Sequence, residues 1–493
     1  MATRQPTLLL KNLSRHSRRC LLNSAPSSIA AAAVPPSGNP GSVPGDIVDP
    51  KTAALGKALL NLDDAKELFS SVSTSKLLKS SVTLHMTAVE PLVDVGLWVM
   101  KSRLMGVPLL RESILGIVKL VFYDHFCGGK DLHEVGRTVS NLSESGLKAM
   151  LDYGLEHATD NSSCDISLKE ILQTADSVNS LPSSSVSFIV VKITAICPKR
   201  LIKRVSDLLR WEFKNPSFHL PWKQKTLPIF CESSPLYHTT KEPEPLSREE
   251  EHDLDLCHQR LQRICEKCLE VDVPLFIDAE DTVLQPAIDY MAYTAAVSYH
   301  REDNPLVFGT VQAYLKDAKE RLVGTKKAAD KMGIPMGFKL VRGAYMSSER
   351  QVASSLGVES PIHNTIHQTH ACFNDCMSFM LNEIANGSGA VVLATHNVES
   401  GKIAATKVTD LGMRKDSLKV QFGQLYGMSD ALSYSLRNAG FQVSKYLPFG
   451  PVDEIMPYLM RRGEENRGVL SASSLDRQLM RNEVKRRLLS TIF

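Results

Sequence analysis

The sequence contains no apolar run long enough to cross a membrane as a helix. Such a helix needs about 18 or more consecutive residues with few or no charges. The nearest candidate, residues 106–126, is interrupted by Arg111, Glu112 and Lys119. A spanning segment is therefore not predicted. The stretch is still apolar enough for a buried helix or for one that lies on a membrane surface, so peripheral attachment stays open.

Neither sign of charge is in large excess, and the cysteines form no regular framework. Lysine and arginine total 57 against 54 aspartates and glutamates. No basic patch with interleaved aromatic residues occurs, so no nucleic-acid partner is predicted. The one close cysteine pair, Cys265 and Cys268, follows His258 but has no second pair or HxxxH motif to complete a metal site. We predict no metal, and reduced thiols in an internal compartment.

Acidic residues are absent from the first 45 positions. This segment is rich in serine and carries five basic residues, namely Arg4, Lys11, Arg15, Arg18 and Arg19. Such a composition is typical of an organellar transit peptide, whereas a secretory signal would carry one apolar core. We predict that residues 1–45 are a mitochondrial transit peptide and linker, with chloroplast import as the alternative.

The rest of the chain changes its pattern near residue 146. Residues 46–145 show apolar positions at helical spacing, which predicts a helical N-terminal region. Eight short apolar runs then alternate with helical stretches, and we predict strands at 148–156, 187–196, 274–280, 307–315, 337–345, 389–396, 418–425 and 441–450. Strands that alternate with helices form parallel sheets. Eight of them predict an α/β fold, a (βα)8 barrel of the TIM type over residues 146–475.

Two further segments complete this organisation. The long gap between the second and third strands predicts a surface insertion at about 200–265 that ends in a helix. Residues 476–493 are predicted to be a C-terminal helical tail.

Polar residues lie at the C-terminal ends of most of the predicted strands. They are Lys192, Asp278, Gln312, Arg342, Tyr345, His396, Asn397, Gln424 and Tyr446. Any one of them could be a polar residue at a strand end that is hydrogen-bonded and has no functional role. In a TIM barrel, however, the C-terminal strand ends meet at one rim, which carries the active site. We therefore expect these side chains to surround a common pocket.

The stretch "YLMRRGEENR" directly follows the eighth strand. At helical spacing Tyr458, Arg461, Arg462 and Glu465 share one face. Taken alone, this face would be a solvated surface. Its place after the last strand puts it at the rim instead, where paired guanidinium groups suit a carboxylate or a phosphate. The only GxG motif nearby, at 387–389, precedes a strand rather than following one, so it does not indicate a dinucleotide fold.

Seven motifs occur in order along the predicted barrel: "IDAED", "VQAY", "KLVRGAY", "ATHN", "QLYGM", "YLPFG" and "YLMRRGEEN". Together they resemble the proline dehydrogenase family, and more narrowly its monofunctional mitochondrial members of the plant type. The resemblance covers residues 274–467 and includes Lys192. It implies a distorted (βα)8 barrel that binds FAD non-covalently and oxidises L-proline to Δ1-pyrroline-5-carboxylate, the first step of proline catabolism. It also implies a respiratory quinone as electron acceptor and a place on the matrix side of the inner mitochondrial membrane.

The resemblance also implies roles for individual residues. The catalytic group comprises Lys192, Asp278 and Lys339. The substrate-binding group comprises Lys192, Tyr345, Leu425, Tyr446, Tyr458, Arg461 and Arg462. The FAD-binding group comprises Gln312, Lys339, Arg342, Gly343, Ala344, Thr395, His396 and Asn397.

Two other functions stay open at the level of sequence. A Schiff-base aldolase on a TIM barrel would use Lys192 as its nucleophile. A membrane-associated assembly protein would use the helices at 75–125 and the acidic insertion, with the barrel as a scaffold. Neither alternative predicts a coloured cofactor, so the visible absorbance of the purified protein separates them from a flavoenzyme.

Overall fold

The computed structural model describes residues 59–155, 158–231, 238–301, 304–466 and 472–492. All of these belong to one compact unit. The transit peptide predicted at 1–45 lies outside the described residues.

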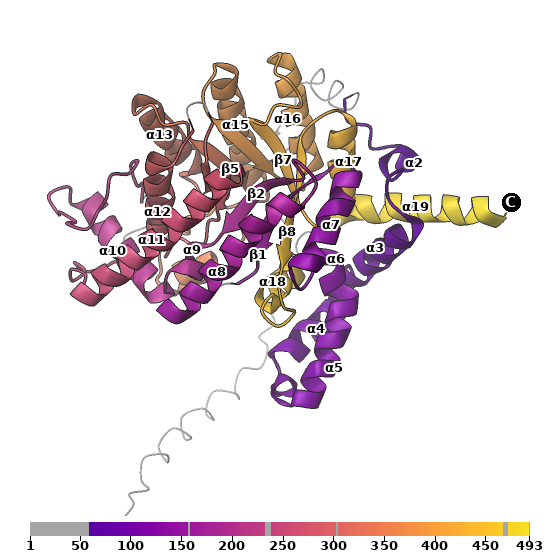
Figure 1. The fold of residues 1–493 in the computed structure, drawn as a ribbon, viewed down its shortest axis with the longest axis horizontal. Helices are drawn as coiled ribbons and strands as arrows, with labels where there is room; N and C mark the ends of the chain where they lie inside the picture. Colours follow the sequence, from indigo (N-terminus) through magenta and orange to yellow (C-terminus); the bar gives the residue numbers. More distant parts are fainter. Residues whose placement is uncertain (1–58, 156–157, 232–237, 302–303, 467–471, 493) are drawn as a thin grey trace, which may run out of the picture. The chain divides into compact units, whose positions relative to one another are not determined.

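A closed barrel of eight parallel strands forms the centre of this unit, with helices arranged around it (Figure 1). The strands are β1 (Lys148–Tyr153), β2 (Val186–Val191), β3 (Leu275–Ile277), β4 (Val307–Gln312), β5 (Gly337–Val341), β6 (Ala390–Ala394), β7 (Val420–Leu425) and β8 (Val443–Phe449). Each strand pairs in parallel with its neighbours in the chain, and β8 closes the barrel against β1. The predicted (βα)8 fold is confirmed.

The barrel interior is a packed apolar core. Its buried side chains come from most of the strands and are Met150, Phe188, Val190, Phe276, Phe308, Ala390, Val392 and Tyr446. The rings of Phe188 and Phe276 stack with their centroids 3.7 Å apart. The Lys339 ammonium lies over this core, 5.3 Å from the Phe276 ring centroid and 4.7 Å from that of Tyr446. The Lys339 ammonium therefore lies immediately next to the apolar core of the barrel.

The outer layer consists of helices that follow the strands. They are α8 (Asn161–Ser177), α9 (Ile193–Ile196), α10 (Lys199–Lys214), α11 (Arg248–Glu270), α12 (Gln285–Ser298), α13 (Ala318–Lys331), α14 (Met346–Ser355), α15 (Ile366–Ala385), α16 (Val398–Asp410), α17 (Asp430–Asn438) and α18 (Met456–Asn466), with a 3-10 turn η3 (Val178–Ser180). Local sequence starts several of them. Ser247 and Glu250 form a capping box on α11, and Thr365 and Gln368 form one on α15.

The segment at 200–265 differs from the predicted surface insertion. Helix α10 packs against α12, and the side chains of Leu201, Val205 and Leu208 on α10 are buried in the main core. Most of its charges lie on the opposite face, because α10 is strongly amphipathic, and Arg210 is the buried exception. The charged composition predicted exposure of the whole segment, whereas α10 and much of α11 belong to the layer that covers the barrel.

The N-terminal region is helical, as the sequence predicts. Its elements are α2 (Ala65–Leu68), α3 (Thr74–Thr87), α4 (Glu90–Lys101), the 3-10 turn η1 (Arg103–Gly106), α5 (Pro108–Val118), the π-helical turn η2 (Lys119–Tyr123), α6 (Asp124–Phe126) and α7 (Leu132–Glu144). Helix α3 packs against the C-terminal helix α19 (Ala472–Ile492). On α19, Arg487 donates hydrogen bonds to the carbonyls of Phe69 and Val72, both at 2.7 Å. Within the described ranges, none of the helices is both long and apolar enough to span a membrane.

Candidate active site

Five polar side chains from five strands meet above the apolar core of the barrel. Lys192 donates to Asp152, with the nitrogen 3.0 Å from Oδ2. Lys339 donates to Asp278 at 2.5 Å. The Tyr446 hydroxyl lies 2.7 Å from Asp152 and 2.9 Å from Asp278, and so joins the two ion pairs. We call these five residues the charge layer.

Strand geometry explains this meeting. Asp278 follows β3, and its amide donates to the Val191 carbonyl at 3.0 Å, which extends the β2–β3 ladder by one residue. Lys192 is the next residue after β2, so the side chains of Lys192 and Asp278 come within 4.0 Å. On the other side, β1 pairs with β8 and sets Asp152 beside Tyr446. The barrel closure between β8 and β1 is thus needed to complete the cluster.

All five members of the charge layer are buried, and their formal charges sum to zero. Burial raises the pKa of Asp152, although Lys192 opposes this shift. Burial acts in the same direction on Asp278, but Lys339 and Lys192 outweigh it, so that the pKa of Asp278 lies below its usual value. Burial and the two carboxylates raise the pKa of Tyr446 far above normal. The phenol therefore stays protonated as a hydrogen-bond donor.

A second polar group surrounds Arg342, directly after β5. Its guanidinium donates to His370 Nδ1 at 2.9 Å, Thr395 Oγ1 at 2.6 Å and Ser400 Oγ at 2.8 Å. It also lies 4.4 Å from the centroid of the Phe373 ring. All these groups are neutral, and burial lowers the pKa of Arg342 to about 10. A partly buried cation held by neutral groups favours an anionic ligand.

The start of α16 adds to this anion-binding character. Asn397 caps the helix by accepting from the Ser400 amide at 2.8 Å, and the Ser400 hydroxyl reaches Arg342. The first turn of a helix presents unpaired N–H groups and the positive end of its dipole. The guanidinium and a helix N-terminus therefore act on the same space between β5 and β6.

Gly343 follows Arg342 and allows the backbone to approach closely at this point. Its φ is +132°, and a Cβ there would lie 2.4 Å from the Tyr314 ring. Every other residue would be strained and would clash. The next residue, Ala344, is exposed, and Tyr345 is partly buried at the start of α14.

The other predicted site residues make contacts that connect the strand ends. Gln312 Nε2 donates to the Glu280 carbonyl at 2.9 Å, which links β4 to the loop after β3. His396 Nε2 accepts from the Leu425 amide at 3.1 Å. Leu425 itself packs against two apolar clusters, one that contains Tyr446 and one that contains Tyr458. Leu425 is therefore the contact between the barrel interior and α18.

The arginine-bearing helix is only partly exposed on its polar face. Tyr458 is 5% exposed, and Arg461 is partly buried. The side chains of Arg462 and Glu465 lie outside the described residues. The burial of Tyr458 disagrees with a fully solvated stripe.

The comparisons with known proteins agree with this geometry. A family profile described as "Proline dehydrogenase" matches residues 135–475. The chain belongs to the proline dehydrogenase family. It is 56% identical over 434 residues to "Proline dehydrogenase 2, mitochondrial" of Arabidopsis thaliana, a match that covers 87% of this chain and 91% of the relative. "Proline dehydrogenase 1, mitochondrial" of the same plant is also 56% identical, over 446 residues, with 90% and 89% covered.

The fold also resembles that of a larger bacterial protein. Proline utilization A from Bdellovibrio bacteriovorus, solved after inactivation by N-propargylglycine, superposes with a TM-score of 0.60 at 17% identity. The match covers 88% of this chain and 44% of that chain, so the present chain spans less than half of the bacterial protein. At this identity the likeness shows the fold alone. Membership of the proline dehydrogenase family makes the protein an oxidoreductase.

Two residues of the site are not predicted from the sequence. Asp152 lies in β1, and its only signal in the sequence is an acid within a buried strand. His370 holds Arg342 from α15, and nothing in the helical pattern of α15 distinguishes it. Both are partners of predicted residues rather than members of the motifs.

The ion pair of Lys192 with Asp152 can be tested by stability. Lys192→Met leaves a buried carboxylate without its cation and should lower the free energy of unfolding by about 3–5 kcal/mol. Without Lys192 the pKa of Asp152 rises further, so the folded state binds a proton more tightly than the unfolded chain. The stability of Lys192→Met should therefore fall as the pH rises above about 4, the unfolded-state value. Urea denaturation across a pH series measures both effects.

Asp152→Asn provides the matched second change. Added to Lys192→Met, it removes the uncompensated charge, so the double variant should recover most of the lost stability and lose the pH dependence. A double variant no more stable than Lys192→Met alone would show that the two side chains do not form a buried ion pair.

Proposed function

We propose that this protein oxidises L-proline to Δ1-pyrroline-5-carboxylate with non-covalently bound FAD, as the first step of proline catabolism. The observation that carries this proposal is the charge layer, which lies at the C-terminal strand ends of a barrel of the proline dehydrogenase family. A TIM barrel carries its active site at this end.

FAD would be held on the side of the rim that includes β4, β5 and β6. The residues assigned to it are Gln312, Lys339, Arg342, Gly343, Ala344, Thr395, His396 and Asn397. The chemistry of this set fits the cofactor, because the partly buried guanidinium of Arg342 and the start of α16 suit its pyrophosphate. Gly343 supports the shape of this segment, because the Tyr314 ring occupies the place that a Cβ would take. When bound, FAD supplies the two-electron acceptor for the hydrogen removed from C5 of proline.

Proline would lie on the other side of the rim. Lys192, Arg461 and Arg462 are assigned to its carboxylate, since guanidinium groups bind a carboxylate with two parallel hydrogen bonds. Tyr446 and Tyr458 would pack on the ring, with Tyr345 and Leu425 closing the pocket. Leu425 supports this arrangement, because it packs against the clusters that contain both tyrosines. Fixing the ring in one orientation turns a collision into a positioned reaction.

The arginines assigned to the carboxylate would also favour the reactive form of the substrate. Proline carries a protonated ring nitrogen in water, and this proton must leave before a C=N bond forms. Arg461 and Arg462 would disfavour a second positive charge beside them and so promote that loss. Asp278 and Asp152 would keep the two lysines charged and fixed. We assign these four residues to binding and electrostatics rather than to a proton relay.

The ion pair of Lys192 argues against the aldolase alternative. A Schiff-base lysine must be neutral to attack a carbonyl, and enzymes obtain this by apolar surroundings or by a neighbouring cation. Lys192 instead donates to both oxygens of Asp152, at 3.0 and 3.2 Å. This contact stabilises the ammonium form.

We further propose a location at the matrix side of the inner mitochondrial membrane and a respiratory quinone as electron acceptor. The acid-free leader and the two relatives named as mitochondrial support the mitochondrial location. A membrane location brings the enzyme to a lipid-soluble acceptor.

Helices α4 and α5 supply a surface suited to peripheral attachment. Leu109 is 75% exposed, Trp98 64% and Ile117 63%. Exposed apolar side chains at this density mark an interaction surface, and a helix that carries them beside basic residues can lie in a membrane interface. Helix α4 also contacts α18, so this surface adjoins the proposed substrate helix.

Cofactor content and proline-dependent reduction test the central proposal. The protein purified without its first 45 residues should be yellow, and anaerobic L-proline should bleach it. Arg342→Met should lower the ratio of FAD to protein, because it removes the cation assigned to the pyrophosphate. Arg414→Met is the control, since Arg414 is exposed and pairs with Asp416 at the surface. A colourless protein that gains neither colour nor activity with added FAD would refute the proposal.

Substituting Arg461 tests the carboxylate clamp. Arg461→Met removes a charge-assisted contact, which costs about 2–5 kcal/mol for a buried charge pair. The expected loss in kcat/KM for proline is about 30-fold or more. Arg461→Lys should recover only part of it, because a single ammonium cannot form the two-pronged contact. FAD content should stay normal. Kinetics like those of the wild type would show that this helix face is a solvated surface and does not bind the proline carboxylate.

Vesicle binding tests the proposed membrane surface. Leu109→Glu together with Ile117→Glu should abolish co-sedimentation with vesicles that contain anionic phospholipid, because both changes charge the exposed apolar face. Turnover with a soluble electron acceptor should be unchanged. Ile166→Glu is the control, because Ile166 is also well exposed, at 59%, but lies on α8. Equal binding by all three proteins would exclude α4 and α5 from membrane contact.

A further inference from the structure

The loop between β3 and α12, residues 278–284, carries a key part of the site. It begins with Asp278, which contacts Lys339 and Tyr446. Two residues later, the Glu280 carbonyl accepts from Gln312. The loop thus touches the residues assigned to proline and to FAD. Its conformation decides where the Asp278 carboxylate lies.

Glu349 holds this loop from one side. It is 3% exposed, and its two oxygens accept from the Thr282 amide and the Thr282 hydroxyl, both at 2.6 Å. Burial raises the pKa of Glu349, while the two Thr282 hydrogen bonds oppose the shift. Glu349 belongs to α14, which begins directly after Arg342–Tyr345. It therefore connects the loop of Asp278 to the segment assigned to FAD.

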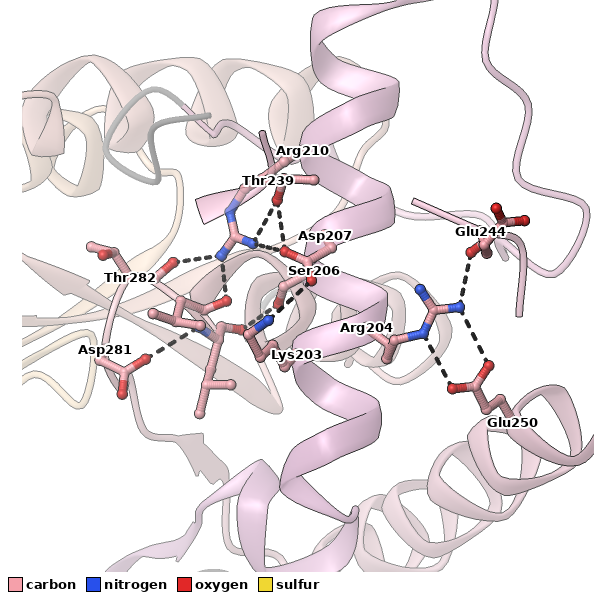
Figure 2. A network of polar contacts seen from close by, with 12 residues as sticks. Lys203, Arg204, Ser206, Asp207, Arg210, Thr239, Glu244, Glu250, Asp281 and Thr282 are labelled. Atoms are coloured by element: carbon pink, nitrogen blue, oxygen red, sulfur yellow. Dashed lines mark hydrogen bonds and ion pairs between the residues drawn. The ribbon is translucent and has the colours of Figure 1, made fainter. Parts of the chain in front are cut away.

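Arg210 holds the loop from the other side (Figure 2). This side chain of α10 is 0% exposed. It donates to the Thr282 carbonyl at 2.8 Å and also to the Val283 carbonyl. Asp207 balances its charge at 2.8 Å. The Thr282 and Val283 carbonyls precede α12, and both accept from the Arg210 guanidinium.

Thr282 is consequently held between opposite charges. Its amide and hydroxyl donate to a carboxylate, and its carbonyl accepts from a guanidinium. Hydrogen bonds to charged groups are shorter and stronger than those between neutral groups. Both charged side chains are buried, so water does not compete for these contacts.

We propose that Glu349 and Arg210 form a clamp on Thr282 that positions Asp278, which makes Glu349 a positioning residue for proline binding and turnover. This inference rests on the role proposed above for Asp278 in the substrate site. Asp278 lies between Lys339 at 2.5 Å and Tyr446 at 2.9 Å, so its place tolerates little movement. A displacement of about 1 Å in such a group can cost about 100-fold in rate.

Substitutions at both ends of the Glu349–Thr282 contact test the clamp. Thr282→Val removes the hydroxyl donor and should lower kcat/KM for proline at least about tenfold, whereas Thr282→Ser keeps both donors and should remain near the wild type. Glu349→Gln should lower kcat/KM to a similar extent, with the change mainly in KM. The double variant Thr282→Val, Glu349→Gln should lose little more than either single change, because both act through one contact. All rates are expressed per bound FAD.

Lys326→Met controls for a purely structural effect. Lys326 is fully buried and donates to Asp330 and Ser388, on the side of the barrel where β6 begins. This variant should lose thermal stability but keep kcat/KM per bound FAD. If Glu349→Gln and Thr282→Val behave like Lys326→Met, the network is only structural and the clamp is refuted. If a Glu349 variant fails to fold, the comparison of Thr282→Val with Thr282→Ser still decides. A wild-type protein without proline turnover would instead refute the proposed function itself.

Discussion

The ion pair between Lys192 and Asp152 is the constraint on which the rest of the site depends. An ammonium and a carboxylate are costly to bury singly, and each is tolerated here because the other lies at 3.0 Å. Their meeting requires that β1 pair with β2. Pairing of β8 with β1 then sets Tyr446 beside Asp152, and the Tyr446 hydroxyl joins this ion pair to Asp278 and Lys339, so the cluster is complete only in the closed barrel.

The sequence was sufficient to predict the barrel but not the ends of its strands, and this difference has a physical cause. All eight strands occur where apolar runs predict them, but the runs extend too far. Residues 193–196 were assigned to a strand, whereas they form the helical turn α9. These residues are buried and apolar in either conformation, so burial alone cannot distinguish them. In α10, the many charged residues of one face predicted an exposed segment, although the leucines of the other face are buried.

The site was predictable where a residue belongs to a strand-end motif and not where it acts through a partner. Lys192, Asp278, Lys339 and Tyr446, all named from motifs or strand ends, lie together in the structure, and their roles in binding stay proposals. Asp152, His370 and Glu349 were not predicted. Each holds a motif residue, or the loop that carries one, from an element distant in the chain. A contact of this kind depends on how helices and strands pack, which local spacing does not encode.

The two polar groups at the rim differ in how their charge is balanced, and this difference matches their proposed ligands. The lysines of the charge layer are each paired with an aspartate, so the layer is neutral before a substrate binds. Free proline is a zwitterion and also neutral, and a balanced site can accept it without leaving a charge buried alone. Among the described residues, the groups that hold Arg342 are neutral. A permanent anion such as the proposed pyrophosphate would balance its charge, whereas an aspartate beside Arg342 would compete with it. On the proposed assignment, cations paired with carboxylates would face the substrate, and a cation held by neutral groups would face the cofactor.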